Sequence, residues 1–238
     1  MRERTVAVHL LGRCALTLQA HPVTLSSASA RVVAFLALHR GPQPRSYVAG
    51  HIWPEISEAR ARANLRNAIW RTQPLGDDVL VCDSESVGLA DDVDVDIEAV
   101  REAAQLILSG VALAPPYPRP EAFCGELLTD WEDEWVLFER ERLKQLCVRA
   151  LESLSDVYRR AGDFIGAIDS ALLAVNMEPL RESAHRAISR VHIAEGNLAS
   201  ARQQFDRYER LARDELGVSP SSDFIELVSV PRSTRMPA

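Results

Sequence analysis

The stretch EARARANLRNAIWRTQ, residues 58–73, decides how this chain folds at its N-terminal end, because it predicts a two-faced helix. Successive residues of a helix are turned by about 100°, so the polar side chains gather in one stripe. The stripe consists of Arg60, Asn64, Asn67 and Arg71, flanked by Ala63, Arg66 and Trp70. The opposite side is apolar and consists of Ala61, Leu65, Ala68 and Ile69. Arg and Asn carry forked groups that match guanine and adenine edges. The stretch therefore predicts a DNA recognition helix.

The charge is unevenly distributed along the 238 residues. The net charge is −7, which alone argues against nucleic acid. Residues 1–75, however, hold ten Arg and three acidic residues, whereas residues 76–100 hold nine acidic residues and no Lys or Arg. Because attraction to phosphate depends on local charge, this pattern indicates a basic binding end attached to an acidic body.

The segments around the Arg-rich helix predict short strands and two further helices. Alternating residues over 6–12 and 15–25 predict strands with turns near Gly12 and at His21-Pro22. Ser26 or Ser27 can cap a helix that ends at Gly41-Pro42, and a second short helix covers 46–53. After the Arg-rich helix ends near 74–76, alternation over 78–83, 86–90 and 92–97 predicts a terminal hairpin. This order is that of a winged helix-turn-helix with an N-terminal sheet.

The C-terminal part predicts a helical repeat. A helix from Asp96 to about Ser109 is followed by a Pro-rich connection over 112–123, and the rest is helical. A shift of 34 residues superimposes two helix–Gly–cap–helix units. The matched pairs are Ser155 with Ser189, Val157 with Val191, Gly162 with Gly196, Asp163 with Asn197, Phe164 with Leu198 and Ala167 with Ala201. Small residues, with Ala174 among them, are expected where antiparallel helices approach closely.

The expected fold is mainly α with a small β component. A winged-helix DNA-binding domain is predicted over 1–98, and an all-α, tetratricopeptide-like domain over 99–238 with a flexible tail at 229–238. The concave face of such repeat arrays usually binds protein.

Five stretches of the chain resemble the Streptomyces antibiotic regulatory protein (SARP) family of transcriptional activators. They are 38–55, 61–71, 125–146, 180–197 and 214–221, and the resemblance extends over roughly residues 5–225. It implies an OmpR-like winged helix that binds direct DNA repeats. The last three stretches resemble the bacterial transcriptional activation domain, which contacts DNA-bound neighbours or RNA polymerase. Many members control secondary-metabolite clusters, including antibiotic biosynthesis. The candidate wing, 79–96, departs from the family pattern because it contains Asp83, Glu85, Asp91 and Asp92 but no Arg or Lys.

The predicted DNA contacts lie on the Arg-rich helix and at the start of the helix before it. They are Arg60, Arg62, Asn64, Arg66, Asn67 and Arg71 on the recognition helix, with Arg45 and Ser46 at the start of the second helix. Arg45 could hold a phosphate together with backbone amides, or it could be a simple loop cation. The bland alternative for residues 58–73 is the solvated face of an ordinary surface helix. For Trp70 the sequence favours core or edge packing.

Other functional classes find little support. The chain has no nucleophile motif, no Gly-rich phosphate loop and no ligand spacing for a metal, so no catalytic residue, metal site or cofactor is expected. The run 91–96 lacks the Gly and Glu of a calcium loop, and Asp94 or Asp96 is expected to cap the next helix. We find no apolar run long enough for a membrane span and no signal peptide. The four scattered cysteines are expected to be reduced and buried in a cytoplasmic protein.

The sequence thus predicts a sequence-specific transcriptional activator rather than an enzyme. Its expected partners are double-stranded promoter DNA, RNA polymerase holoenzyme and a second copy of itself on DNA, with no membrane partner. The acidic wing and the net charge of −7 keep an alternative open. In that alternative the helical repeat is a protein-interaction or regulatory module, and the winged helix has weak or no DNA binding.

Overall fold

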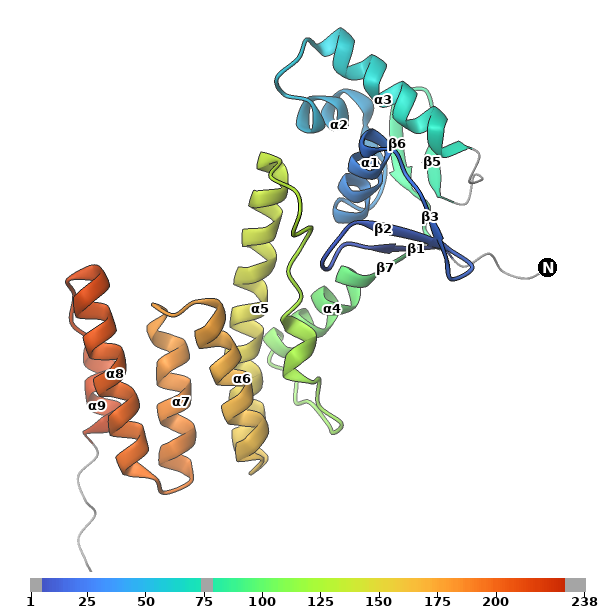
Figure 1. Cartoon of the computed structure of the whole chain (residues 1–238). Coiled ribbons are helices and arrows are strands. Elements are labelled where there is room, and N and C mark those ends of the chain that lie inside the picture. Colours follow the sequence, from blue (N-terminus) through green and yellow to red (C-terminus); the bar gives the residue numbers. More distant parts are fainter. Residues whose placement is uncertain (1–5, 74–78, 230–238) are drawn as a thin grey trace, which may run out of the picture. The chain divides into compact units, whose positions relative to one another are not determined.

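A computed structural model describes residues 6–73 and 79–229, which form mainly helices with two small sheets (Figure 1). Contacts divide the chain into two compact units. As far as their residues are described, unit 1 is Met1–Glu102 with Gly125–Leu143, and unit 2 is Ala103–Cys124 with Lys144–Ala238. Residues 125–143 thus group with the N-terminal part, although the predicted second domain starts at residue 99. The predicted domain ranges remain a prediction, and the predicted tail lies, except for Ser229, outside the described residues.

Unit 1 combines helices with two small sheets. Its elements are β1 (Val6–His9), β2 (Ala15–Leu18), β3 (His21–Val23), α1 (Ser27–Leu38), β4 (Gln43–Pro44), α2 (Arg45–Ile52), α3 (Glu58–Thr72), β5 (Leu80–Cys82), β6 (Ser86–Leu89), β7 (Asp94–Val95) and the start of α4 (Asp96–Leu108). The sheets have the strand orders β3-β2-β1-β7 and β4-β6-β5. The order of elements confirms the winged helix. The predicted helix end at 74–76 lies outside the described residues.

Local sequence signals account for most of these elements. The Ser26 side chain accepts a hydrogen bond from the Ser29 amide and caps α1, as expected. Val6 and Val8 of β1 are buried and pack the sheet onto α1, whose residues Val32 to Leu38 are all buried. The predicted turn at His21-Pro22 is wrong, because both residues lie in β3. The chain turns at Gln19 and Ala20 instead, which have φ values of 52° and 63°.

The end of the winged helix differs from the predicted hairpin. The hairpin consists of β5 and β6 alone, while β7 pairs in parallel with β1 and completes the N-terminal sheet. Of the two residues expected to cap α4, Asp94 lies in β7, and the other, Asp96, is the first residue of the helix. The Asp96 carboxylate accepts hydrogen bonds from the amides of Leu10 and Leu11 at 2.9–3.0 Å. These amides follow the last pair of β1, so a buried strand end needs an acceptor, and the carboxylate supplies it.

Residues 125–143 complete unit 1. Leu127 and Leu128 are fully buried, and the Leu128 amide donates to the Leu10 carbonyl at 2.9 Å. The Arg140 guanidinium donates to the carbonyls of Leu127 and Leu128, which holds this segment to the start of α5 (Glu134–Arg160). Removing this segment would therefore open the core of the winged helix.

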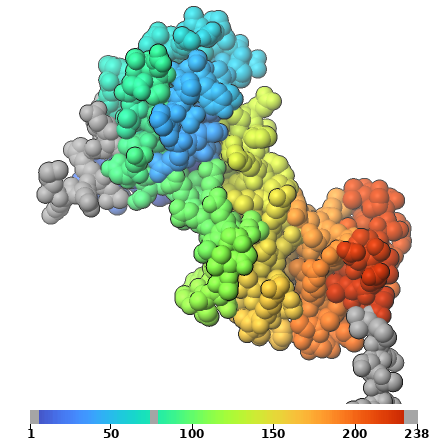
Figure 2. All heavy atoms as spheres, turned by 180° about the vertical axis from the view of Figure 1, so that it is seen from behind, coloured from blue at the N-terminus to red at the C-terminus, as the bar shows by residue number. Residues whose placement is uncertain are grey.

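Unit 2 is a helical array. It contains a 3₁₀ helix (Pro120–Phe123), the later part of α5, and four more helices: α6 (Phe164–Met177), α7 (Glu182–Ala194), α8 (Leu198–Leu216) and α9 (Ser222–Val228). In the space-filling view the colours run in order from yellow to red along this unit, so its helices stack in chain order (Figure 2).

The 34-residue period is confirmed at the level of single contacts. The Ser155 hydroxyl donates to the Ala167 carbonyl at 2.8 Å, and the Ser189 hydroxyl donates to the Ala201 carbonyl at 3.2 Å. All four residues are at most 1% exposed. Gly162 and Gly196, with φ of 78° and 79°, end the first helix of each unit. Asp163 and Asn197 then cap α6 and α8. The positions paired by the 34-residue shift are therefore structurally equivalent.

The expected burial of the four cysteines is only partly correct. Cys147 is buried and Cys14 half-buried, but Cys82 and Cys124 are exposed. Burial raises the pKa of the Cys14 and Cys147 thiols to about 11, and at Cys14 the carboxylates of Asp130 and Asp96 add to the shift. Both thiols are therefore protonated and unreactive near neutral pH. In residues 6–73 and 79–229 we find no helix with the length and apolar character that crossing a membrane requires.

Candidate nucleic-acid interface

Helix α3 is held by its apolar face. Ala61, Leu65 and Ala68 are at most 2% exposed, as the sequence predicts. The buried Ser29 hydroxyl of α1 donates to the Ala68 carbonyl at 3.1 Å, which fixes the position of α3 along α1. Thr72 donates to the carbonyl of Ile69 at 2.7 Å and closes the last turn. The exposed face of α3 is thus presented on a rigid support.

The exposed face of α3 carries the predicted DNA contacts. Arg60, Arg62, Arg66, Asn67 and Arg71 are exposed, and Asn64 is half-buried. Arg62 forms an ion pair with Glu58 at 2.7 Å, one turn earlier. Among residues 6–73 and 79–229 we find no ion pair to Arg60, Arg66 or Arg71. Three guanidinium groups on one helix face are thus available for an anionic ligand.

Arg45 and Ser46 lie at the N-terminus of α2, next to the β5–β6 hairpin. The Arg45 amide donates to the Glu85 carbonyl at 2.9 Å, and its Nε donates to the Ser86 carbonyl at 3.3 Å. Arg45 is half-buried and Ser46 is exposed. The Nε bond orients the guanidinium and leaves its terminal nitrogens unused in the described structure. The Arg45 side chain is therefore held to the hairpin by this hydrogen bond, and its role toward phosphate stays a prediction.

Two hollows between α3 and the hairpin bring part of the predicted set together. One, of about 490 Å³, is lined by Arg45, Ser46, Arg62 and Arg66. The other, of about 560 Å³, is lined by Arg45 and Arg66 together with Trp70 and Val81. Arg45 and Arg66 line both, so positive charge converges beside the hairpin from α2 and from α3. Arg60, Asn64, Asn67 and Arg71 line neither hollow and lie along the separate stripe of α3.

One carboxylate of the acidic hairpin, that of Asp83, stabilises the turn between β5 and β6. The Asp83 carboxylate accepts hydrogen bonds from the amides of Glu85 and Ser86 at 2.7 and 2.6 Å, and from the Ser86 hydroxyl at 2.7 Å. These bonds, the Ser86 hydroxyl bond first, lower the pKa of Asp83 to about 2. The turn therefore requires an acid that a DNA-contacting wing would otherwise avoid.

Trp70 does not pack into the core as expected, because 69% of its surface is exposed. It lies on the solvent face of α3 between Arg66 and Asn67, opposite the buried residues. Val81 on the hairpin is also 61% exposed. The helical wheel contains the signal, since Trp70 lies nearly opposite Leu65 and Ala61, but a Trp is ordinarily assigned to packing.

Comparison with known proteins identifies the C-terminal half. Residues 121–229 match the family described as the bacterial transcriptional activator domain, BTAD. The chain carries a bacterial transcriptional activator domain. The stretches 125–146, 180–197 and 214–221, which resemble the activation domain of the SARP family, all lie within this match. A search of curated proteins found no match.

The chain is also similar to a solved structure, that of Mycobacterium tuberculosis EmbR in complex with a low-affinity phosphopeptide. The TM-score is 0.78 at 19% sequence identity, and the match covers 95% of this chain but 64% of the EmbR chain. At this identity the likeness establishes the fold alone. It confirms the predicted combination of a winged helix with a helical domain.

Proposed function

We propose that this BTAD regulator is a sequence-specific DNA-binding activator that binds direct repeats in promoters and recruits RNA polymerase. The observation that carries the proposal is the exposed face of α3, with Asn67 beside three arginines that have no ion pair among the described residues. Forked side chains on a rigid helix suit the edges of bases in the major groove. A secondary-metabolite gene cluster is the proposed target, by resemblance to the SARP family.

The predicted residues fall into two proposed roles. Arg60, Asn64, Asn67 and Arg71 form the stripe proposed to read bases. Arg45, Ser46, Arg62 and Arg66 lie beside the hairpin and are proposed to hold the phosphate backbone, where the α2 N-terminus adds its amides. Trp70, exposed between these groups, is added as an apolar contact to sugar or to a thymine methyl group.

A second reading is favoured by one observation, the exposed acids Asp83 and Glu85 at the hairpin turn. Their negative charge repels phosphate, so the protein could instead act as an interaction module with weak or no DNA binding.

Two copies side by side on a direct repeat are part of the leading proposal, with a spacing of about 11 base pairs, close to one helical turn.

Selection of bound DNA from a random pool, followed by anisotropy measurements at several salt concentrations, separates the two readings. Asn67→Ala is expected to cost about 1–3 kcal/mol and to relax preference at one base. Arg45→Ala is expected to weaken all sequences alike and to lower the salt slope by about one. Arg210→Ala, an exposed arginine of α8, is the matched control and should change neither. If no sequence is enriched, or if Asn67→Ala binds like the wild type, the assignment of α3 is wrong.

A further inference from the structure

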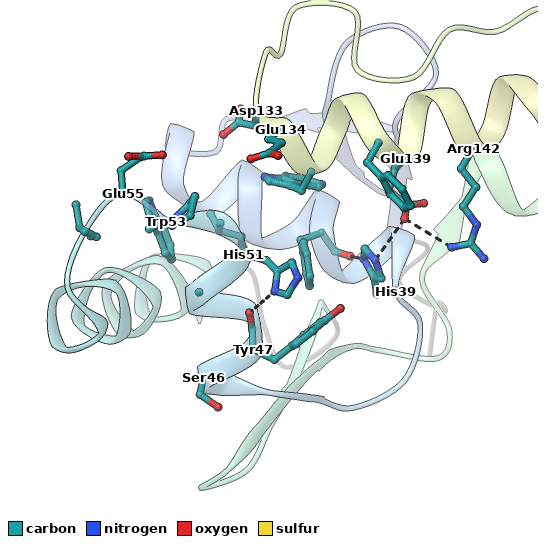
Figure 3. A pocket seen from close by; sticks show the side chains of 17 residues that line it. His39, Ser46, Tyr47, His51, Trp53, Glu55, Asp133, Glu134, Glu139 and Arg142 are labelled. Carbon is teal, nitrogen blue, oxygen red and sulfur yellow. Dashed lines mark hydrogen bonds and ion pairs between the residues drawn. The ribbon is translucent and has the colours of Figure 1, made fainter.

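Unit 1 has a large cleft away from the hollows beside the hairpin. It has a volume of about 1080 Å³ and is lined by α1, α2, the 52–56 segment and the first turns of α5. Figure 3 shows its side chains converging from these elements. Of the predicted DNA contacts, only Ser46 also lines this cleft. No residue of α3 lines the cleft, so the cleft is available while α3 is engaged.

Aromatic rings line much of the cleft. Phe35, which is 1% exposed, stacks on His39 with ring centroids 4.3 Å apart and meets Trp135 edge-on at 5.4 Å. At the mouth, Tyr47 is 42% exposed and Phe138 is 69% exposed. A Phe exposed beside a hollow leaves apolar surface in water, which a partner could cover.

Two of the carboxylates that line the cleft, those of Asp133 and Glu139, are paired with arginines. Asp133 is held by the Arg31 guanidinium at 2.8 and 3.2 Å. Glu139, 4% exposed, faces Arg101 at 3.5 Å and Arg142 at 3.6 Å.

Two carboxylates remain without such partners. Glu55 and Glu134 are exposed and form no ion pair within residues 6–73 and 79–229. Figure 3 shows both on the side of the view away from Arg142. The mouth of the cleft is thus aromatic with a net negative edge.

We propose that this cleft docks a short segment of a partner protein in which a Lys or Arg lies beside an apolar side chain. The apolar side chain would cover Phe138 and Tyr47, where a buried aromatic contact gives the largest share of binding energy. The cation would pair with Glu134 or Glu55 and lie against the ring faces. An acidic segment would instead bring like charges together. The choice of RNA polymerase as the partner to test rests on the proposed function.

The test measures binding of purified RNA polymerase holoenzyme from the same organism to the full chain, with and without its DNA site. Phe138→Ala is expected to weaken polymerase binding about tenfold. Glu134→Gln is expected to weaken it about threefold at low salt and less at high salt. Both variants should keep the melting temperature and DNA affinity of the wild type. Leu137→Ala and Glu132→Gln, exposed neighbours that do not line the cleft, are the matched controls and should change nothing.

The polymerase-binding measurements have outcomes that support or overturn the inference. Wild-type polymerase binding by both cleft variants would overturn the inference. So would a wild-type chain that binds DNA but not polymerase. Self-association that is lost in Phe138→Ala would assign the cleft to a second copy and also overturn it. A chain that binds polymerase through the cleft but binds no DNA would support the inference and refute the proposed function.

Discussion

Ala201→Leu tests the repeat register most directly. Ala201 is 1% exposed at the contact of α8 with α7, and its carbonyl accepts the Ser189 hydroxyl bond. A leucine adds three carbon atoms where a buried alanine leaves no room. Overpacking of this kind costs about 1–3 kcal/mol. For a chain of this size, about 2 kcal/mol lowers the melting temperature by about 4–8 °C.

The assay monitors thermal unfolding by circular dichroism. Hydrogen exchange of the backbone amides then shows which helices have lost stability. Ala199→Leu is the matched control, because it makes the same substitution at an exposed position of the same helix. Ala167→Leu, at the equivalent position of the first unit, should be destabilised like Ala201→Leu. Faster exchange should appear in both α7 and α8, since stacked repeats share a core. If Ala201→Leu and Ala199→Leu melt at the same temperature, the reasoning about the 34-residue register is refuted.

Three further predictions follow from unit 1. Trp70→Ala should lower DNA affinity about threefold to tenfold while changing stability by less than about 0.5 kcal/mol, because the side chain is largely exposed; a melting curve and an anisotropy titration check this. A fragment ending at residue 110 should melt well below the intact winged helix, because it lacks the buried Leu127 and Leu128; a fragment as stable as unit 1 would contradict this. The pKa of Asp83 is lowered in the folded chain, so the hydrogen bonds of its turn should persist above pH 4 and be lost as the pH falls toward 2. The amide chemical shifts of Glu85 and Ser86 would report this loss. The Asp83→Asn variant should lack the transition.

Signals within one or two turns of chain were enough for much of this fold. The face of α3, the Ser26 cap and the paired units at Gly162 and Gly196 follow from spacing along the chain. The first two depend on neighbours three or four residues apart, which the geometry of a helix relates directly. The third depends on a repeat of 34 residues that the sequence itself displays. The candidate base-reading stripe belongs to this class, although its role is still a proposal.

Other errors came from weighing a residue type over its position. Trp70 was assigned to packing because Trp is usually buried, yet its place on the wheel of α3 puts it in solvent. Asp94 or Asp96 is expected to cap α4 from its place near the helix start, yet the Asp96 carboxylate accepts hydrogen bonds from the distant amides of Leu10 and Leu11. In both cases a tertiary neighbour, or the lack of one, overrode the local preference.

The sequence by itself determined the helices, their buried faces and the period of the repeat, because each is set by side chains close together along the chain. Only the tertiary structure decided that β7 joins β1, that residues 125–143 complete the winged helix, and that Phe138 is exposed at an aromatic cleft. These features join segments roughly 85 to 120 residues apart. No pattern within either segment records the pairing, since it depends on which buried amides and apolar faces are left unsatisfied once the chain has folded.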